Sequence, residues 1–222
     1  MNRQLLRVCL ILSVLVPCSA VAQQPGGPMH SITRYEITLL GGYRDGGSLQ
    51  GFETGPLKPF AASVRASTSL AFAVDVPVSA AFQVELWGSR QNGEVETGIP
   101  IDGSHTGTDL KISYLQLGVV KNWYSSDSVA YYLTVATGVA QLRLQSLTRR
   151  SESRLSASLA GGVKLFLGDY SAIRLDLRGY WIGTDTRSTA IAPGALIYFK
   201  KNFLQAEASV GVSFKVGKSS CE

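Results

Sequence analysis

Polar and apolar residues alternate along most of this chain, and the pattern is clearest between residues 112 and 145. In the second half of that stretch, Tyr131, Leu133 and Val135 share one parity, while the residues between them are small or polar. A period of two is what a pleated strand imposes. The stretch therefore predicts two strands of about a dozen residues each, joined by a short polar turn at 124–128.

The same alternation recurs along the chain and predicts eight strands. Their expected ranges are 33–44, 65–76, 79–90, 109–123, 129–145, 154–167, 172–184 and 202–216. Connections after the second, fourth and sixth strands are short, whereas those after the first, third and seventh are long. Pro77 cannot donate a ladder hydrogen bond and marks one of the short turns. The apolar segment 195–199 falls in the last long loop, either as an extension of the barrel wall or as an additional strand.

The fourth strand changes parity along its length. Leu110 and Ile112 share one parity, whereas Leu115 and Leu117 share the other. Two explanations are open: a bulge near Ser113, or an upper end of the strand that projects beyond the lipid.

These strands are long for a soluble protein. Soluble strands typically have about five or six residues, whereas a tilted strand that crosses a bilayer needs about 9–11. Short turns at one end and long loops at the other are typical of outer-membrane barrels, and only closure satisfies every backbone group in lipid. The pattern predicts an all-β fold, an eight-stranded antiparallel up-and-down transmembrane β-barrel. A soluble β-sandwich is the alternative, disfavoured because outward leucine and valine would leave an apolar belt in water.

The first residues indicate export. Arg3 and Arg7 precede an apolar core at 10–16, and 20–22 read Ala-Val-Ala, which is typical of a signal-peptide cleavage site. The core is far shorter than the roughly 20 residues of a spanning helix. The predicted organisation is a signal peptide (1–22), a flexible lead-in (23–32), the barrel (33–216) and a tail (217–222).

Charge and cysteine content exclude several classes of protein. Loss of Arg3 and Arg7 with the signal takes the formal charge from +5 to +3, and no basic run or basic-aromatic cluster points to nucleic acid. Cys9 and Cys18 leave with the signal, although Cys18 keeps lipid modification open as an alternative. Only Cys221 remains, so an internal disulfide or a cysteine metal site cannot form.

Charged residues occupy the parity opposite the apolar one, so they should face the barrel interior. This predicted interior set is Arg34, Glu36, Arg44, Arg65, Asp75, Glu85, Lys164, Arg174, Asp176, Arg178, Glu207 and Lys215. Unpaired buried charge is costly, so the two signs predict an ion-paired polar plug. The alternative is a narrow solute path beside a wall of small residues, namely Ala136, Gly138, Ala140, Ala160 and Gly162.

Aromatic residues near the predicted strand ends fit the interfacial girdles of a membrane barrel. They are Tyr35, Tyr43, Trp123, Tyr131, Trp181 and Phe214.

Residues suited to catalysis are few. The histidines are His30, which precedes the barrel, and His105, which lies near Asp102 and Ser104 in a glycine-rich loop. Nucleophile sets need a rigid scaffold, which such a loop does not supply. We therefore expect no catalytic, metal or cofactor site. A lipid-modifying enzyme centred on His105 is the third-ranked alternative.

Three segments carry a resemblance to a known family. Residues 113–121, SYLQLGVVK, resemble the strand "YLEIPLLLKY" of the outer-membrane β-barrel family that includes the PorT-like proteins of Bacteroidetes, although Gly118 stands where that family usually has proline. The segments 131–139 and 204–214 resemble its "PYLFAGPSVGY" and "LQLSLGVSF" strands. The resemblance implies a fold and a membrane, and it makes Phe214 the candidate contact for the barrel-assembly machinery.

The long loops remain as the expected functional surface. Their apolar residues predict β-extensions above the membrane or a binding surface; they are Leu49, Phe52, Leu57, Phe60, Ile99, Ile101 and 196–199. We expect a non-enzymatic protein of the bacterial outer membrane with both termini in the periplasm. Its expected partners are outer-membrane lipids, the assembly machinery and an extracellular protein or surface ligand. A small transporter or channel is the second-ranked function.

Overall fold

The computed structural model describes residues 34–45, 48–53, 59–97, 108–144, 150–183, 188–192, 195–198 and 203–217. Within these ranges the chain forms twelve strands that belong to one sheet. Eight of them make the barrel wall: β1 (Tyr35–Arg44), β4 (Ser67–Pro77), β5 (Phe82–Thr97), β6 (Thr108–Ser126), β7 (Val129–Leu144), β8 (Arg150–Phe166), β9 (Ser171–Ile182) and β12 (Phe203–Val216).

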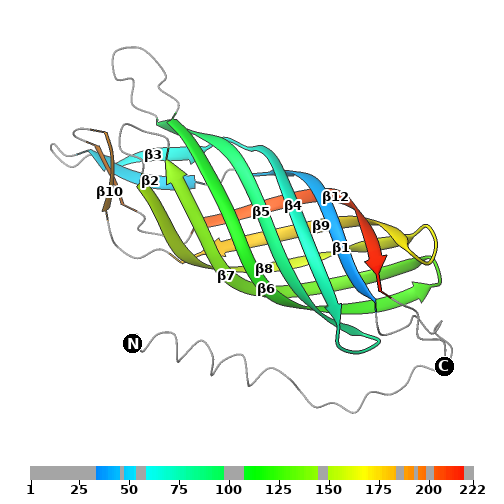
Figure 1. Ribbon diagram of the computed structural model, residues 1–222. Coiled ribbons are helices and arrows are strands. Elements are labelled where there is room, and N and C mark those ends of the chain that lie inside the picture. The colour runs from blue at the N-terminus through cyan, green and yellow to red at the C-terminus, as the bar shows by residue number, and fades with distance from the viewer. Residues whose placement is uncertain are drawn as a thin grey trace, which may run out of the picture.

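The wall closes on itself through antiparallel pairs. Each of these strands pairs with the next one along the chain, β5 pairing with both β4 and β6, and β12 returns to pair with β1. Tyr35 faces Val216 and Arg44 faces Glu207 across the closing seam. The predicted fold, a closed eight-stranded antiparallel barrel, is confirmed (Figure 1).

No helix that is long and apolar enough to cross a membrane occurs among the described residues.

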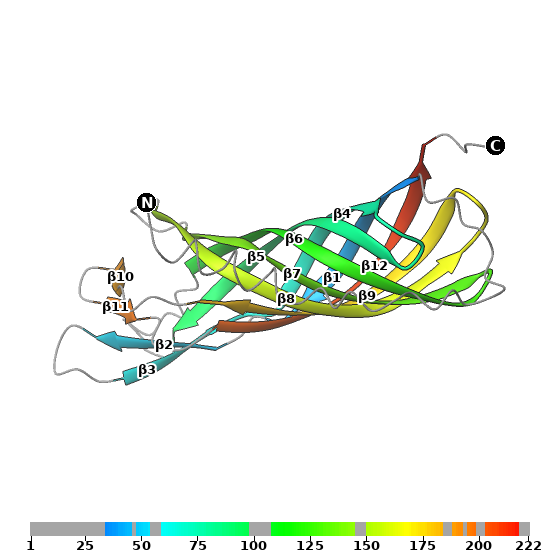
Figure 2. The same cartoon turned by 90° about the horizontal axis from the view of Figure 1, so that it is seen from below.

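Four further strands extend the sheet beyond one end of the barrel (Figure 2). They are β2 (Ser48–Glu53), β3 (Pro59–Val64), β10 (Ser188–Ala192) and β11 (Ala195–Tyr198). β3 pairs with the end of β5, β2 pairs with β3, and the β10–β11 hairpin joins through β2. The segment 195–198 is therefore a strand of a loop extension and no part of the closed ring.

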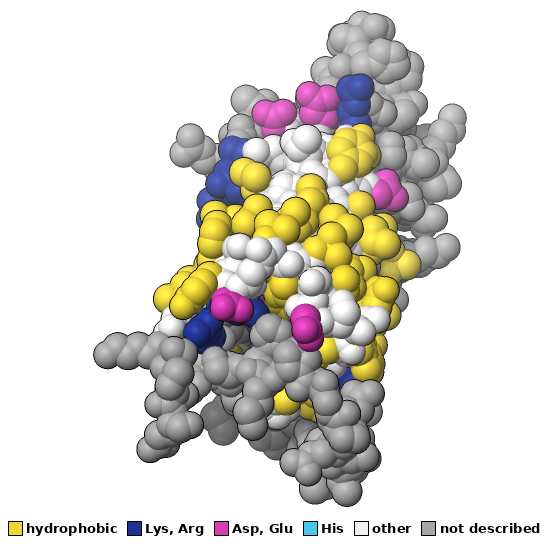
Figure 3. All heavy atoms as spheres, turned by 90° about the vertical axis from the view of Figure 1, so that its right-hand side faces the viewer, with side chains coloured by type: hydrophobic (Ala, Val, Ile, Leu, Met, Phe, Trp, Pro, Cys, Tyr) yellow, Lys and Arg dark blue, Asp and Glu magenta, His cyan; other side chains and the backbone are white. Residues whose placement is uncertain are grey.

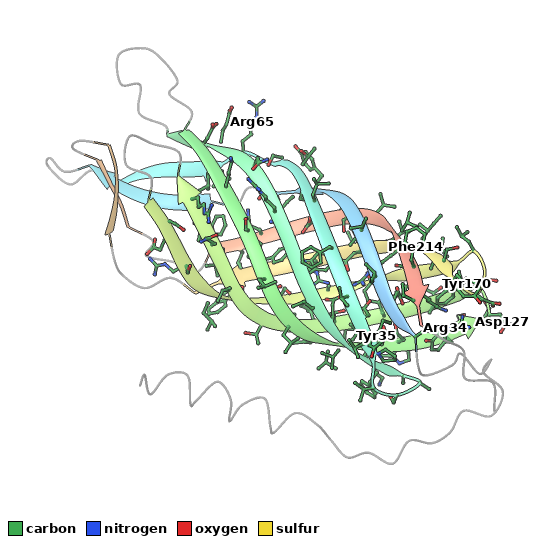
Figure 4. All side chains as sticks on the ribbon, in the orientation of Figure 1. Arg34, Tyr35, Arg65, Asp127, Tyr170 and Phe214 are labelled. Carbon is green, nitrogen blue, oxygen red and sulfur yellow. The ribbon has the colours of Figure 1, made fainter. Side chains whose placement is uncertain are left out.

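The two ends of the barrel differ. The short turns at 78–81, 127–128 and 167–170 lie at the end where β1 begins and β12 finishes, and we call this the turn end. Figure 4 shows Arg34, Tyr35, Asp127, Tyr170 and Phe214 there, with Arg65 at the opposite end. The opposite end carries the extension strands β2, β3, β10 and β11, and we call it the loop end.

The outer surface is apolar around its middle. Leucine, valine and isoleucine side chains point outward from all eight wall strands, as with Leu39, Leu117 and Leu177, each more than half exposed. In Figure 3 hydrophobic side chains gather across the middle of the visible face, with charged ones above and below. We call this surface the apolar belt. Of the six predicted girdle aromatics, five are exposed at its margins, and Trp181 is half-buried on the same outward parity.

Of the two explanations for the parity change in the fourth predicted strand, the structure rules out the bulge near Ser113 and supports the projecting strand end. β6 pairs with β5 and with β7 without a register shift through this residue. Leu110 and Ile112 instead continue the inward face and are buried, while Leu115 and Leu117 point outward. The parity change therefore reflects a change of surroundings, because the strand projects past the apolar belt. Beyond the belt its inward residues are apolar and its outward ones polar.

Several sequence predictions lie outside the described residues. They are the signal peptide (1–22), the lead-in (23–32), the tail from 218 onward, and the loop residues His30, Asp102, Ser104 and His105.

Candidate functional site

Charged side chains fill the half of the barrel nearer the turn end. Strand periodicity explains their position, because residues two apart on one strand share a face: Arg174, Asp176 and Arg178 all point inward from β9. Seven such residues contact one another and form what we call the ion cluster: Glu36, Asp75, Glu85, Lys164, Arg174, Asp176 and Arg178. All seven side chains are almost fully buried.

Arg174 lies at the centre of the ion cluster. Its guanidinium lies 2.7 Å from Glu85, 3.1 Å from Asp75 and 3.2 Å from Asp176. Arg178 bridges Glu85 at 2.9 Å and Asp176 at 3.4 Å. These contacts cross the lumen from β9 to β4 and β5, so the ion pairs link opposite walls of the barrel.

Lys164 holds the side of the ion cluster that is nearer the turn end. Its ammonium lies 2.9 Å from Glu36 and 3.4 Å from Asp75, and it donates to the amide oxygen of Gln83 at 3.3 Å. Four carboxylates and three cations therefore share one buried site, and each cation touches at least two acids. Charges that are paired and hydrogen-bonded in this way avoid the cost of isolated buried charge.

Aromatic side chains pack against the buried cations. The Arg178 guanidinium lies 3.6 Å from the ring centroid of Trp87, and that of Arg174 lies 4.5 Å from the ring of Tyr132. The Tyr132 hydroxyl also donates to Asp176 at 2.7 Å and accepts from Arg174 at 2.9 Å. Trp87 and Tyr132 therefore belong to the interior network, although their inward parity was the only sign of this in the sequence.

A second buried ion pair lies nearer the loop end. Arg44 donates to Glu207 at 2.7 Å, and the Tyr180 hydroxyl donates to the same carboxylate at 2.5 Å. Trp87 Nε1 donates to the Tyr180 hydroxyl oxygen at 3.1 Å. Because Trp87 also packs against Arg178, it connects the Arg44–Glu207 pair with the ion cluster. The Arg44 guanidinium lies over the rings of both Tyr114 and Tyr180.

A layer of buried apolar side chains lies in the interior towards the loop end. It comes from β3, β6, β7, β9 and β12, and we call it the apolar cap. Its members are Val64, Leu110, Ile112, Tyr114, Ala140, Leu142, Tyr180, Ile182 and Phe203. The interior roles of Leu110, Ile112 and Ile182 were not predicted, because the alternation predicts small or polar residues on the inward face.

Three predicted interior residues lie outside the buried network. Arg65 is exposed at the loop end, because it follows β3 in the connection to β4, and its expected position inside the barrel is wrong. Arg34 and Lys215 are partly exposed at the turn end, where their charged groups lie over the rings of Tyr170 and Phe166. The other nine are buried.

The wall of small residues that could line a solute path leaves no free space at Gly162. A β-carbon added there would lie 2.0 Å from the Leu175 carbonyl oxygen and 2.4 Å from the Tyr132 hydroxyl. Tyr132 is the cross-strand partner of Gly162, so its side chain takes the space that the glycine leaves. At Gly138 the backbone of Leu115 comes equally close, with the carbonyl oxygen 2.1 Å from an added β-carbon.

Among the described residues, no group of three or more histidine, cysteine, aspartate and glutamate side chains is arranged to hold a metal ion. The described interior combines ion pairs, tyrosine hydroxyls and apolar packing, which is chemistry suited to holding the walls together.

Solved structures share this fold. The outer membrane protein OprG from Pseudomonas aeruginosa is 14% identical with a TM-score of 0.61, over 84% of this chain and 98% of OprG. The outer membrane protein AlkL, whose structure was determined in lipid bilayers, is 12% identical with a TM-score of 0.52, over 86% of this chain and 94% of AlkL. Neisserial surface protein A is 11% identical with a TM-score of 0.51, over 82% and 97%.

No protein-family model matches the sequence, and a search of curated proteins found no match. The chain thus has the fold of outer-membrane barrels, and the finer resemblance to PorT-like proteins stays a prediction.

The Tyr180 hydroxyl offers a direct test of the Arg44–Glu207 ion pair and its surroundings. Tyr180→Phe should lower the free energy of unfolding by about 1–3 kcal/mol, because the Glu207 carboxylate and the Trp87 N–H each lose a buried partner. Urea titration in detergent measures the change, with the folded fraction read on a denaturing gel from the band that migrates fast without boiling. Tyr43→Phe is the matched control, since the Tyr43 ring is exposed and its hydroxyl makes one long contact of 3.4 Å. Equal losses in the two variants would contradict a structural role for the hydroxyl.

Proposed function

We propose that this protein is a non-enzymatic β-barrel of the bacterial outer membrane that acts through the surface at its loop end. The observation that carries the proposal is the contrast between the two faces of the wall. Outward side chains form the apolar belt, whereas the ion cluster and the Arg44–Glu207 pair point inward and are paired with one another. Such a surface is stable in lipid and would drive association in water.

The described interior favours a structural plug over a pore. The ion cluster, the Arg44–Glu207 pair and the apolar cap follow one another along the lumen and are buried. An eight-stranded barrel leaves room for little beyond its own side chains. The second-ranked function, a small transporter or channel, would require these layers to move apart.

The loop end is the surface we assign to interaction. There β2, β3, β10 and β11 continue the sheet beyond the wall, and rigid barrels commonly carry their binding residues on such connections. Short turns are periplasmic in outer-membrane barrels, so we place both termini in the periplasm and the extension outside the cell. An extracellular protein or a surface ligand is the partner that this orientation allows.

Three measurements on the purified mature chain test the proposal: gel mobility, circular dichroism and bilayer conductance. Without boiling it should run as a compact, fast band on a denaturing gel and shift on heating, with a β-type circular dichroism spectrum. In planar bilayers the same sample should give no conductance steps. A chain that is soluble without detergent and shows no heat shift would overturn the membrane assignment. Reproducible conductance or liposome swelling would favour a channel, and lipid product formation that is lost on His105→Ala would favour an enzyme.

A further inference from the structure

Three basic side chains point outward from neighbouring strands near the loop end. They are Arg90 on β5, Lys111 on β6 and Arg143 on β7, and we call them the basic patch. Arg90 and Arg143 are exposed and Lys111 is partly exposed. They share their parity with outward belt residues of the same strands, such as Leu86, Leu115 and Val139, so they lie on the wall itself and outside the lumen.

Strand register places the basic patch directly beyond the apolar belt. One cross-strand row of β5, β6 and β7 holds Gly88, Leu115 and Val139, and the two apolar members are about half exposed. The next row towards the loop end holds Arg90, Ser113 and Gln141, and the row after it holds Asn92, Lys111 and Arg143. The surface therefore changes from apolar to basic within two rows.

The patch brings like charges together. Lys111 and Arg143 are direct cross-strand partners, and Arg90 is the diagonal neighbour of Lys111. Side chains in direct pairs have β-carbons about 4.5–5.5 Å apart, and like charges in such positions repel. Within the described part of the chain, none of the three forms a salt bridge. The nearest outward acids by register, Glu94 and Asp109, face each other one row further from the belt. Glu94 and Asp109 can offset the charge of Lys111 from the side away from the belt, and an anion bound between Arg90, Lys111 and Arg143 would relieve the repulsion that remains.

We propose that the basic patch binds the phosphate of a lipid headgroup in the leaflet that surrounds the loop end. The inference rests on the proposed membrane location. A lipid satisfies both parts of this surface at once, because its acyl chains can cover Leu115 and Val139 while its phosphate lies against the three cations. Arginine suits such a ligand, since its planar guanidinium matches phosphate oxygens in pairs. A soluble anion would gain nothing from the adjacent apolar row.

Native mass spectrometry of the folded chain in detergent micelles tests the proposal, with lipid A that carries two phosphates as the probe. Each basic side chain near a charged lipid surface contributes about 1 kcal/mol, which corresponds to about fivefold in affinity. The triple variant R90Q/K111Q/R143Q should therefore bind lipid A about a hundredfold more weakly. Dephosphorylated lipid A should bind the unaltered chain no better than lipid A binds the triple variant.

Lys121→Gln is the matched control. Lys121 also points outward from β6, but it lies towards the turn end, over the rings of Phe82 and Trp123. Its loss should change lipid A affinity less than twofold. Equal weakening by Lys121→Gln, unchanged binding by the triple variant, or displacement of lipid A by millimolar inorganic phosphate would each overturn the proposed site.

The heat shift on a denaturing gel separates failure of this site from failure of the proposed function. A variant that shifts on heating is a folded barrel, so its lipid affinity reports on the patch alone. If the triple variant fails to fold, Lys111→Gln takes its place, with an expected loss of about fivefold. Lys111→Gln also relieves the repulsion with Arg143, so in detergent without anionic lipid it should unfold at the same or a higher temperature than the unaltered chain. A lower unfolding temperature together with full lipid affinity would count against the site.

Discussion

Replacing Arg174 with methionine should lower the free energy of unfolding by about 3–5 kcal/mol, because it leaves buried carboxylates without a partner. Arg174 contacts Asp75, Glu85 and Asp176 within 3.2 Å, and its side chain is fully buried. After the change, two cations would face the four carboxylates of the ion cluster. Methionine keeps much of the side-chain length, so the loss reports mainly on charge. The folded fraction, read from the intensity of the fast band of unboiled samples against urea concentration, measures it.

Arg65→Met is the control for this experiment. It removes the same charge and guanidinium from an exposed position at the loop end. Exposed substitutions usually change stability by no more than about 0.5 kcal/mol. If Arg174→Met and Arg65→Met unfolded at the same urea concentration, the ion cluster would contribute nothing to holding the walls, and the interpretation of the interior as a structural plug would be wrong.

Gly162→Ala should destabilise the barrel by about 3 kcal/mol, because overpacking a filled interior forces backbone and side chains apart. The added β-carbon would meet the Leu175 carbonyl oxygen at 2.0 Å and the Tyr132 ring at 2.6 Å. The first of these is backbone of the neighbouring strand and cannot rotate away. Moving Tyr132 would in turn break its hydrogen bonds with Asp176 and Arg174. Thermal unfolding followed by circular dichroism in detergent measures the effect.

Gly161→Ala provides the comparison one residue away. Gly161 points outward, and an added β-carbon would come no closer than 3.6 Å to its neighbours. Alanine restricts the unfolded chain more than glycine does, so Gly161→Ala should leave the barrel as stable as before or slightly more stable. A lumen with free space beside Gly162, as a solute path requires, would instead tolerate both changes equally.

The barrel could be predicted from the sequence because the membrane restricts which residue types each strand can place on its two faces. Each outward residue has to be apolar and each inward one small or polar, so the period of two and the strand lengths carry the fold. The alternation of short turns and long connections then places both described chain ends at the turn end. Even the loop extensions were indicated, by apolar residues such as Phe52 and Phe60 in the connection after the first strand.

The partners inside the barrel could not be predicted in this way. Parity shows that Lys164 and Glu36 point inward, but they are 128 residues apart and lie on strands that are not neighbours. The contacts across the lumen depend on strand tilt and on barrel closure, which no local pattern encodes. For the same reason the parity change after Leu110 and Ile112 left both a bulge and a projecting strand end open, whereas the structure places these residues in the apolar cap.

The sequence by itself determined the eight wall strands, their two faces and their order around the barrel. The tertiary structure decided which charges meet, where the interior changes from ionic to apolar, and which outward cations become neighbours in the basic patch. Alternation is a property of one strand and its solvent, whereas pairing across the lumen or between strands needs closure and register.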